Sequence, residues 1–293
     1  MIKHYVSIAL CFQLILIVIP ANMVTEAEEV RFRPVTIESH MHSFSPNFLY
    51  LLLSFQFQQI NQRWFLWQYP DQMTSSTEYP IIFLLHGAAQ YPFSWFFGLN
   101  RWGREQCSFT LAALERGYLI VAPASSRPVT PGPRAWDIFE EDSRQSEDIQ
   151  FIVDILDWFT RENISINLNK VFCAGFSSGA FMTSRLALDV PDIFTAMAVH
   201  SGSNAEAITL TDRGPIFDCT SPHTIPPNHP PTLIIHGSLD SLVPPEFGIH
   251  YHQELQRHDI KTALLLDENT GHIWISNFND DILHWFSLFR DEC

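Results

Sequence analysis

The stretch that decides the fold is Val171-Phe172-Cys173-Ala174-Gly175-Phe176-Ser177-Ser178-Gly179, which a helical pattern from Phe181 to Leu188 follows. Its first four residues are apolar, as in a buried strand, and residues 175–179 have the form G-x-S-x-G. A serine in this context sits on a tight strand-to-helix turn above the sheet edge. An ordinary Gly/Ser helix start is the alternative. The stretch predicts a buried α/β sheet that presents Ser177 as a nucleophile.

Short apolar runs alternate with amphipathic segments on both sides of this turn. The runs are rich in Val, Ile, Leu and Ala, as in strands covered on both faces; they are Ile81 to Leu85, Tyr118 to Pro123, Val171 to Ala174, Ala196 to His200, Leu233 to His236 and Ala263 to Leu266. Helical spacing marks Glu147 to Phe159, Phe181 to Leu188, Gly248 to Leu255 and Asp281 to Phe289. This order predicts an α/β fold with a mostly parallel, doubly wound sheet and helices on both faces.

Two stretches interrupt the alternation. Residues 203–231 contain six prolines, which predicts a loop or lid insertion rather than a regular element. The uncharged, Phe- and Leu-rich run from Phe44 to Ile60 is interpreted either as a buried edge strand or hairpin, or as an inserted segment over residues 40–59. The second interpretation arises because joining Val35–Ser39 directly to Ile60–Trp64 would make a compact hairpin.

The N-terminus has the pattern of a secretory signal peptide. Lys3 precedes an apolar run from Val6 to Ile19, and the small residue Ala21 follows. The run is shorter than the ~20 apolar residues that span a bilayer, which argues against the alternative of a membrane anchor. We therefore predict a signal peptide over residues 1–21, a single catalytic domain over residues 22–293, and an extracellular protein without stable membrane insertion after cleavage.

The charge of the chain excludes some partners. The formal net charge is −15, and removing residues 1–21 takes away Lys3 and no acid, so the mature charge is −15 − 1 = −16. A strongly negative surface repels polyanions, which argues against nucleic acid and anionic membranes as partners.

Cysteines and a sequon are compatible with export. After signal cleavage Cys107, Cys173, Cys219 and Cys293 remain, and this even number permits two disulfides in an oxidising compartment, with three possible connectivities. Cys173 lies in an apolar strand pattern and could equally be a buried free thiol. Asn163-Ile164-Ser165 is a possible glycosylation site at Asn163.

A serine nucleophile needs a base and an acid that orients the base. His272 follows Gly271 on the loop beyond the last predicted strand, and Asp240 follows the strand before it. The chain order Ser177, Asp240, His272 is that of a Ser-Asp-His triad on an α/β sheet. Asp267 and Glu268 are the rival acids, but they lie on the same strand exit as His272. Because the base must be neutral, activity should rise with pH as the imidazole loses its proton.

Two backbone N–H groups are candidates for stabilising an oxyanion. One belongs to Ser178, directly after the nucleophile, and the other to Ala88 in the turn Leu84-Leu85-His86-Gly87-Ala88-Ala89-Gln90, which follows the first predicted strand.

From about Arg63 to His272 the chain resembles the secreted feruloyl-esterase and polyhydroxybutyrate-depolymerase-like branch of the α/β-hydrolases. Besides the serine turn, the motifs are residues 85–90, Arg134-Ala135-Trp136-Asp137, residues 169–175, Asp240-Ser241-Leu242-Val243-Pro244 and Gly271-His272-Ile273-Trp274. The resemblance implies ester cleavage through an acyl-enzyme without metal or organic cofactor. It implies a triad of Ser177, Asp240 and His272 and an oxyanion pair of Ala88 and Ser178. Trp274 would line the acyl pocket, and with Trp136 would suit a flat or apolar acyl group.

Two departures bear on the substrate. Many relatives that hydrolyse polyesters carry cysteine where this chain has Ala88, and the chain shows no separate polymer-binding domain. Both weaken a polymer depolymerase more than an esterase. The leading hypothesis is a serine esterase acting on a small-molecule or polymeric ester; the alternatives are a serine peptidase of prolyl-peptidase type and a catalytically inactive secreted binding protein. Acyl group, alcohol and oligomeric state stay open.

Overall fold

The computed structural model describes residues 54–70, 78–97, 101–128, 134–138, 146–211, 214–217 and 224–290. The predicted signal peptide, residues 44–53 of the apolar run, Cys219 and Cys293 lie outside these ranges.

An eight-stranded sheet with the order β1-β2-β4-β3-β7-β8-β11-β12 forms the centre of the described part of the chain. Neighbouring strands from β4 to β12 in this order are parallel, whereas β1 and β2 pair antiparallel at one edge. The mostly parallel sheet is therefore confirmed, with all six predicted strands. The strands are β1 Gln56–Ile60, β2 Arg63–Gln68, β3 Tyr79–Leu85, β4 Leu119–Pro123, β7 Ile166–Phe176, β8 Ala196–His200, β11 Thr232–Gly237 and β12 Thr262–Asp267.

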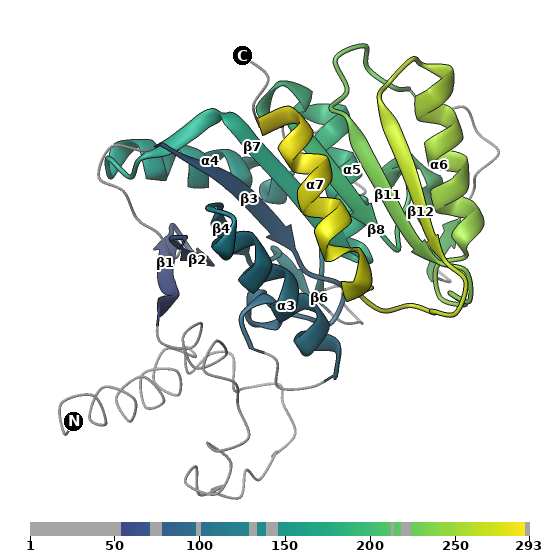
Figure 1. Cartoon of the computed structure of the whole chain (residues 1–293), viewed down its shortest axis with the longest axis horizontal. Coiled ribbons are helices and arrows are strands. Elements are labelled where there is room, and N and C mark those ends of the chain that lie inside the picture. The colour runs from purple at the N-terminus through teal and green to yellow at the C-terminus, as the bar shows by residue number, and fades with distance from the viewer. Residues whose placement is uncertain are drawn as a thin grey trace, which may run out of the picture. The chain divides into compact units, whose positions relative to one another are not determined.

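Helices cover both faces of the sheet, with α3 and α7 on one face and α4, α5 and α6 on the other (Figure 1). The four predicted helices are present with longer bounds, and α3 was missed; the bounds are α3 Arg101–Glu115, α4 Glu147–Arg161, α5 Ser178–Asp189, α6 Pro245–Arg257 and α7 Asn279–Arg290. Local chemistry explains several ends. Ser146 caps α4 by accepting from the Ile149 N–H, and Pro245 opens α6.

The apolar runs become strands because helices bury both of their faces. All seven residues of β3 and all five of β4 are buried, and they share a core with aromatic and aliphatic residues of α4 and α5. Burying a leucine or isoleucine side chain contributes about 1.5–3 kcal/mol, so this cluster supplies much of the stability of the domain.

The cysteine prediction needs correction. Cys107 and Cys173 are buried thiols that form no disulfide, so the two-disulfide arrangement, which requires all four cysteines, does not form. Cys173 lies on β7 in the sheet, and burial raises the pKa of its thiol to about 12. The alternative interpretation of Cys173, a buried thiol that behaves as a small apolar residue, is confirmed.

The end of the Phe- and Leu-rich run forms the edge of the sheet. Residues Gln56–Ile60 are β1, which pairs with β2 across a turn in which Asn61 has a φ of 55°. Phe57 stacks on Trp64 at 5.6 Å between ring centroids, so cross-strand aromatic contacts stabilise the hairpin. Residues 56–60 therefore form an edge hairpin, but β1 is mostly exposed where a buried strand was expected. The inserted segment over residues 40–59 stays a hypothesis.

The proline-rich segment 203–231 is more regular than predicted. It contains a short hairpin of β9 Ile208–Thr211 and β10 Gly214–Phe217, where an irregular loop was expected. A further short pair, β5 Arg127–Pro128 and β6 Arg134–Ala135, precedes Trp136. Short edge strands tolerate proline, because the N–H groups on their outer side need no partner in the sheet.

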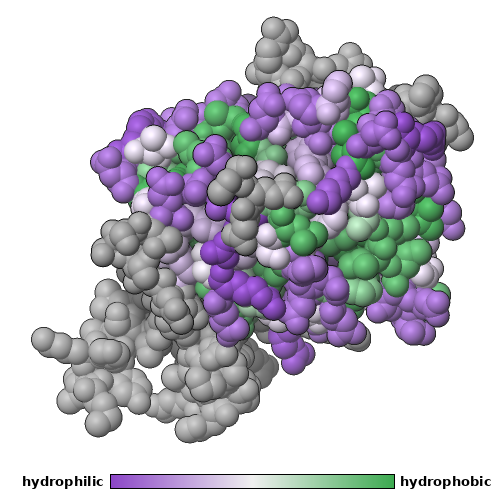
Figure 2. All heavy atoms as spheres, turned by 45° about the horizontal axis from the view of Figure 1, so that its top comes forward, coloured by the Kyte–Doolittle hydropathy of each residue, from purple (hydrophilic) through white to green (hydrophobic). Residues whose placement is uncertain are grey.

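The surface is mostly hydrophilic in the view of Figure 2, with apolar residues gathered toward the side on which β11, β12 and α6 lie in Figure 1. Exposed leucines there include Leu266, the fifth residue of β12. Asn163 of the sequon is exposed in the turn after α4, as an acceptor asparagine must be. Within the described ranges no helix is long and apolar enough to cross a bilayer.

A buried histidine links the loop before β11 to α6. His229 donates from Nδ1 to the Pro230 carbonyl at 2.8 Å, so its Nε2 accepts from the Tyr251 hydroxyl at 2.9 Å. Burial lowers the pKa of His229 from its ordinary 6.5 to about 4. The folded state therefore requires neutral imidazole, whereas the unfolded chain takes up a proton below about pH 6.5.

We predict that the pH dependence of stability depends on this histidine. The contribution of His229 is fully present above about pH 6.5 and is lost as the pH falls toward 4; at about pH 5 the loss is about 2 kcal/mol. In urea unfolding at about pH 7.5 and about pH 5, His229→Gln should lose less stability on acidification than the wild type, by about this amount. The exposed His284→Gln is the control and should behave as the wild type. An equal loss in His229→Gln and wild type would contradict the assignment.

Candidate active site

Ser177 stands at a strained turn between β7 and α5. Its φ is 55° and its ψ is −119°, a backbone conformation that residues other than glycine rarely adopt. Its N–H donates to the His200 carbonyl at 3.0 Å, which ties the turn to the end of β8. The surrounding structure therefore fixes the turn in a conformation that projects the hydroxyl away from the sheet.

The two glycines of the motif allow chain segments to approach closely. A Cβ at Gly175 would lie 2.1 Å from the Gly179 carbonyl oxygen, and a Cβ at Gly179 would lie 2.2 Å from the Leu85 carbonyl oxygen. Neither position has room for a side chain, so α5 can start directly against β3 and β7.

Three side chains from separate loops meet at this edge. His272 Nε2 lies 2.9 Å from Ser177 Oγ, and His272 Nδ1 lies 2.6 Å from Asp240 Oδ2. His272 comes from the loop after β12 and Asp240 from the loop after β11. The structure thus brings together the three residues predicted as a triad, in hydrogen-bonding order. Asp267, the rival acid, instead accepts from Asn269 and Thr270 of its own loop.

The surroundings of Asp240 keep its carboxylate ionised. Burial raises its pKa, but hydrogen bonds from His236 and His272 and from the Val243 N–H outweigh burial and hold the pKa well below the usual range. Its Oδ1 accepts from the N–H groups of Leu242 and Val243, both at 2.9 Å. One oxygen is therefore fixed by the backbone, and the other faces the imidazole of His272.

Two buried histidines beside the triad were missed by the sequence analysis. His236 Nε2 lies 2.8 Å from the Val243 carbonyl oxygen and 3.3 Å from Asp240 Oδ2. His200 Nε2 accepts from the Ile275 N–H at 2.9 Å, and its ring stacks on Trp274. Burial, together with nearby His236 and His272, holds the pKa of His200 well below its usual range, so it is neutral. Their signal was a histidine near the end of an apolar strand, where the site lies.

The turn after β3 is held in a defined orientation next to Ser177. The Gly87 carbonyl accepts from the Gln90 N–H at 3.2 Å and lies 2.9 Å from His86 Nδ1. His86 Nε2 accepts from the Ser125 N–H at 3.3 Å, which places the imidazole proton on Nδ1, toward Gly87. A trans peptide is planar, so fixing the Gly87 carbonyl also fixes the Ala88 N–H, which points the opposite way.

The other oxyanion candidate opens α5. Ser178 is the first residue of that helix, and the N–H groups of a first turn have no intrahelical acceptor. The turn lies close by, because a Cβ at Gly87 would come 3.4 Å from Ser177 Cβ. Two segments that can offer N–H donors to an anion therefore flank the serine, where a helix N-terminus also supplies positive potential.

The predicted roles of the two tryptophans need correction. Trp136 is 2% exposed and Trp274 is 1% exposed, so neither ring presents a surface to an acyl group. Trp274 packs among Trp95, Phe109 and His200 and donates to Asn279 Oδ1 at 2.9 Å. A tryptophan whose indole N–H has a hydrogen-bond partner is well suited to a core. Both tryptophans therefore pack in the core instead of lining a pocket. Over the residues that the structure describes, no group of three or more His, Cys, Asp or Glu could hold a metal ion.

Comparison with known structures agrees with the fold. The chain superimposes on an α/β-hydrolase enzyme from a Medee basin deep-sea metagenome library with a TM-score of 0.59 and 15% identity, covering 82% of this chain and 99% of that one. The chain has the α/β-hydrolase fold. Residues 216–290, which include Asp240 and His272, match the prolyl oligopeptidase family.

Relatives of known name are similar to part or most of the chain. The poly(3-hydroxyoctanoate) depolymerase of Pseudomonas fluorescens is 28% identical over 236 residues, covering 78% of this chain and 80% of the depolymerase. Feruloyl esterase B of Thermothelomyces thermophilus is 33% identical over 139 residues, covering 45% of this chain and 42% of that protein. The resemblance inferred from the sequence motifs is confirmed.

Proposed function

We propose that this chain is a secreted carboxylic ester hydrolase in which Ser177 is the nucleophile, His272 the general base and Asp240 the orienting acid. The observation that carries the proposal is the chain of contacts from Ser177 Oγ through His272 to Asp240, with heavy-atom distances of 2.9 and 2.6 Å. Distances in this range allow a proton to move from the hydroxyl to the imidazole.

The reaction follows from the placement of these groups. Ser177 Oγ attacks the ester carbonyl carbon while His272 Nε2 accepts the hydroxyl proton, and the imidazolium that forms is stabilised by Asp240. The backbone N–H groups of Ala88 and Ser178 stabilise the oxyanion. His272 then donates the proton to the leaving alcohol. Water, deprotonated by the same imidazole, attacks the acyl-enzyme and releases the carboxylic acid and the free serine.

Apolar side chains on nearby loops favour an ester with an apolar part. Leu239 and Leu242, which flank Asp240 in the loop after β11, are each 64% exposed, and Tyr91, after the β3 turn, is 43% exposed. Exposed large apolar residues on site loops typically contact ligands. The relatives named for a medium-chain polyester and for feruloyl esters agree with an apolar acyl or alcohol group.

A serine peptidase is the second candidate, because residues 216–290 match the prolyl oligopeptidase family. That match covers the loops that carry Asp240 and His272, which esterases and peptidases of this fold can share. Amide cleavage needs a protonated amine leaving group and usually an anchor for the peptide terminus. A protein of Emericella nidulans named as a probable dipeptidyl-peptidase 5 covers almost as much of this chain, 75% against 78% for the depolymerase. The esterase is favoured because this chain spans 80% of the depolymerase at 28% identity but 33% of the peptidase at 24% identity.

The test compares esters with amides on the purified protein. We expect hydrolysis of p-nitrophenyl acetate, p-nitrophenyl octanoate and methyl ferulate, and a value of kcat/KM for a matched peptide p-nitroanilide at least about 100-fold lower. Comparable turnover of the anilide would favour the peptidase. Failure of a fluorophosphonate to label Ser177 in folded protein would indicate an inactive binding protein.

Activity should also depend on pH in one direction. Because His272 must be neutral to accept the serine proton, kcat/KM for p-nitrophenyl acetate should rise from acidic to neutral pH, by up to about tenfold for each pH unit. The rate is measured in buffers of constant ionic strength, with the stability of the enzyme checked at each pH. A flat profile over this range would contradict a histidine base.

A further inference from the structure

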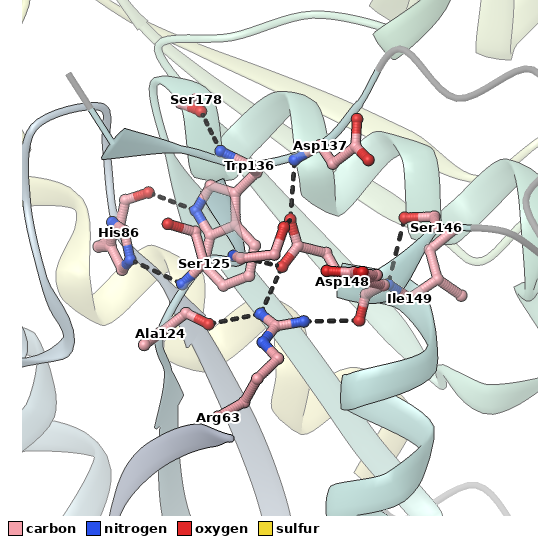
Figure 3. A network of polar contacts seen from close by, with 12 residues as sticks. Arg63, His86, Ala124, Ser125, Trp136, Asp137, Ser146, Asp148, Ile149 and Ser178 are labelled. Atoms are coloured by element: carbon pink, nitrogen blue, oxygen red, sulfur yellow. Dashed lines mark hydrogen bonds and ion pairs between the residues drawn. The ribbon is translucent and has the colours of Figure 1, made fainter. Parts of the chain in front are cut away.

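One buried residue contacts both chain segments that flank Ser177. The indole N–H of Trp136 donates to the His86 carbonyl at 2.7 Å, and the backbone N–H of Trp136 donates to Ser178 Oγ at 3.2 Å (Figure 3). His86 leads into the turn that contains Ala88, and Ser178 begins α5. A single residue therefore bridges the two segments from which the oxyanion donors come.

The indole bond fixes the turn one peptide before Ala88. The peptide between His86 and Gly87 is held on both sides, because its carbonyl accepts from Trp136 while its N–H donates to Gln90 Oε1 at 2.9 Å. The following peptide is held by its carbonyl, as described above. With two successive peptide planes fixed, the Ala88 N–H has little freedom to rotate.

Trp136 is itself anchored by a buried carboxylate. Asp148, on the first turn of α4, has no exposed side-chain surface and accepts from the Asp137 N–H at 2.8 Å, next in the chain after Trp136. The same carboxylate accepts from the N–H and hydroxyl of Ser126, at 2.9 and 3.1 Å, and pairs with Arg63. In Figure 3 these groups converge on Asp148 from separate parts of the chain.

Arg63 connects this anchor to the antiparallel edge of the sheet. Its guanidinium donates to the Ala124 carbonyl at 2.6 Å and lies over the Phe151 ring at 4.1 Å. One residue beyond Asp137, Arg185 of α5 donates to the Ile138 carbonyl at 3.1 Å. Directly before Trp136, β6 pairs with β5, so the chain is held on both sides of Trp136. A segment held in this way can keep a neighbouring site within the roughly 0.5 Å that catalysis requires.

We propose that Trp136 is a positioning residue that sets the separation of the two oxyanion donors, Ala88 N–H and Ser178 N–H. The proposal rests on the ester hydrolase function proposed above. Through its indole N–H it acts on the turn that carries Ala88, and through its backbone N–H it acts on the start of α5. Its burial, which excludes contact with substrate, is what a rigid support of the site needs.

Trp136→Phe tests the indole contact, since phenylalanine keeps an aromatic ring beside His86 and removes the N–H. We expect kcat for p-nitrophenyl acetate to fall about 10- to 100-fold, with KM changed less than about threefold, because the misplaced donors act on the transition state. The inhibition constant of phenylboronic acid, which forms a tetrahedral adduct with an active serine, should rise by a similar factor. The rate is expressed per active site, titrated with a fluorophosphonate.

Ser178→Ala tests the second contact, because it removes the acceptor of the Trp136 N–H and keeps the backbone N–H of residue 178. We expect a fall in kcat of about 3- to 10-fold, and a double variant whose loss is smaller than the product of the two single losses, since both act on one arrangement. The control is Trp285→Phe on α7, where the removed indole N–H has no partner within the described residues. It should hydrolyse the ester at the wild-type rate.

The outcomes separate the two proposals. If the wild type hydrolyses no ester, the proposed function fails. If the wild type is active and Trp136→Phe, at full active-site titre, keeps the wild-type kcat and boronate affinity, the positioning role is overturned while the function stands. If Trp136→Phe does not fold, Ser178→Ala decides: an unchanged kcat and boronate affinity there overturns the role, and parallel losses in both support it.

Discussion

Ser177→Ala should lower the hydrolysis of p-nitrophenyl acetate by about 10⁴-fold or more and abolish covalent labelling by a fluorophosphonate. Ser177 Oγ is the atom that His272 Nε2 contacts, and alanine leaves the imidazole without a nucleophile to deprotonate. The variant should remain folded, because the hydroxyl is removed while the backbone that holds the turn, including the N–H bonded to the His200 carbonyl, is retained. Circular dichroism and thermal unfolding verify the fold.

The neighbouring serine provides the comparison for this variant. Ser178 Oγ accepts from the Trp136 N–H and is not the oxygen in contact with His272, so Ser178→Ala should keep fluorophosphonate labelling and at least about a tenth of the rate. Mass spectrometry of the labelled peptide identifies the modified serine. Labelling that persists in Ser177→Ala and disappears in Ser178→Ala would exchange the roles of the two residues.

Asp240→Asn should lower kcat by about 10⁴-fold with little effect on folding. The introduced amide would keep its carbonyl oxygen toward the N–H groups of Leu242 and Val243, which now bond Oδ1, so its NH₂ group would face His272. A donor at that position favours the tautomer of His272 that carries its proton on Nε2. That nitrogen then cannot accept the proton of Ser177.

The control for this variant is Asp267→Asn. Asp267 is the last residue of β12, and its Oδ1 accepts hydrogen bonds from Asn269 and Thr270 of its own loop. The variant makes the same chemical change as Asp240→Asn but away from His272, so it should keep kcat within about threefold. NMR of the histidine ring nitrogens would show the change of tautomer in Asp240→Asn directly. An Asp240→Asn enzyme with wild-type kcat, or a loss as large in Asp267→Asn, would contradict the assignment of the acid.

The sequence predicted the central sheet well because each inner strand is an uninterrupted apolar run. It also predicted which residues meet, since the carboxyl ends of parallel strands lie on one edge and the loops after β7, β11 and β12 are short. Helix α3 was missed because Arg101–Glu115 lacks the usual signals at its ends, with no acidic residue in the first turn and no basic residue in the last turn. Its position depends on packing against α7.

The predicted roles of tryptophans show where sequence patterns stop being informative. Trp136 and Trp274 lie close to catalytic candidates along the chain, but whether a ring faces a pocket or the core depends on partners far away in sequence. The Trp136 indole donates to the His86 carbonyl, 50 residues earlier, and the Trp274 ring packs between Trp95 and His200. No local pattern specifies such distant hydrogen bonds. The β9–β10 hairpin in the proline-rich segment was not predicted for a similar reason, because its pairing depends on tertiary contacts.

The buried thiol of Cys173 can be used to measure global unfolding of the domain. Cys173 lies in the middle of the sheet, four positions before Ser177, and the high pKa of its thiol leaves almost no thiolate near neutral pH. An alkylating reagent therefore reacts with this thiol only after the sheet unfolds, because movements of the loops around the site do not expose the sulfur. The rate at which this one sulfur is modified under native conditions measures how often the whole domain opens.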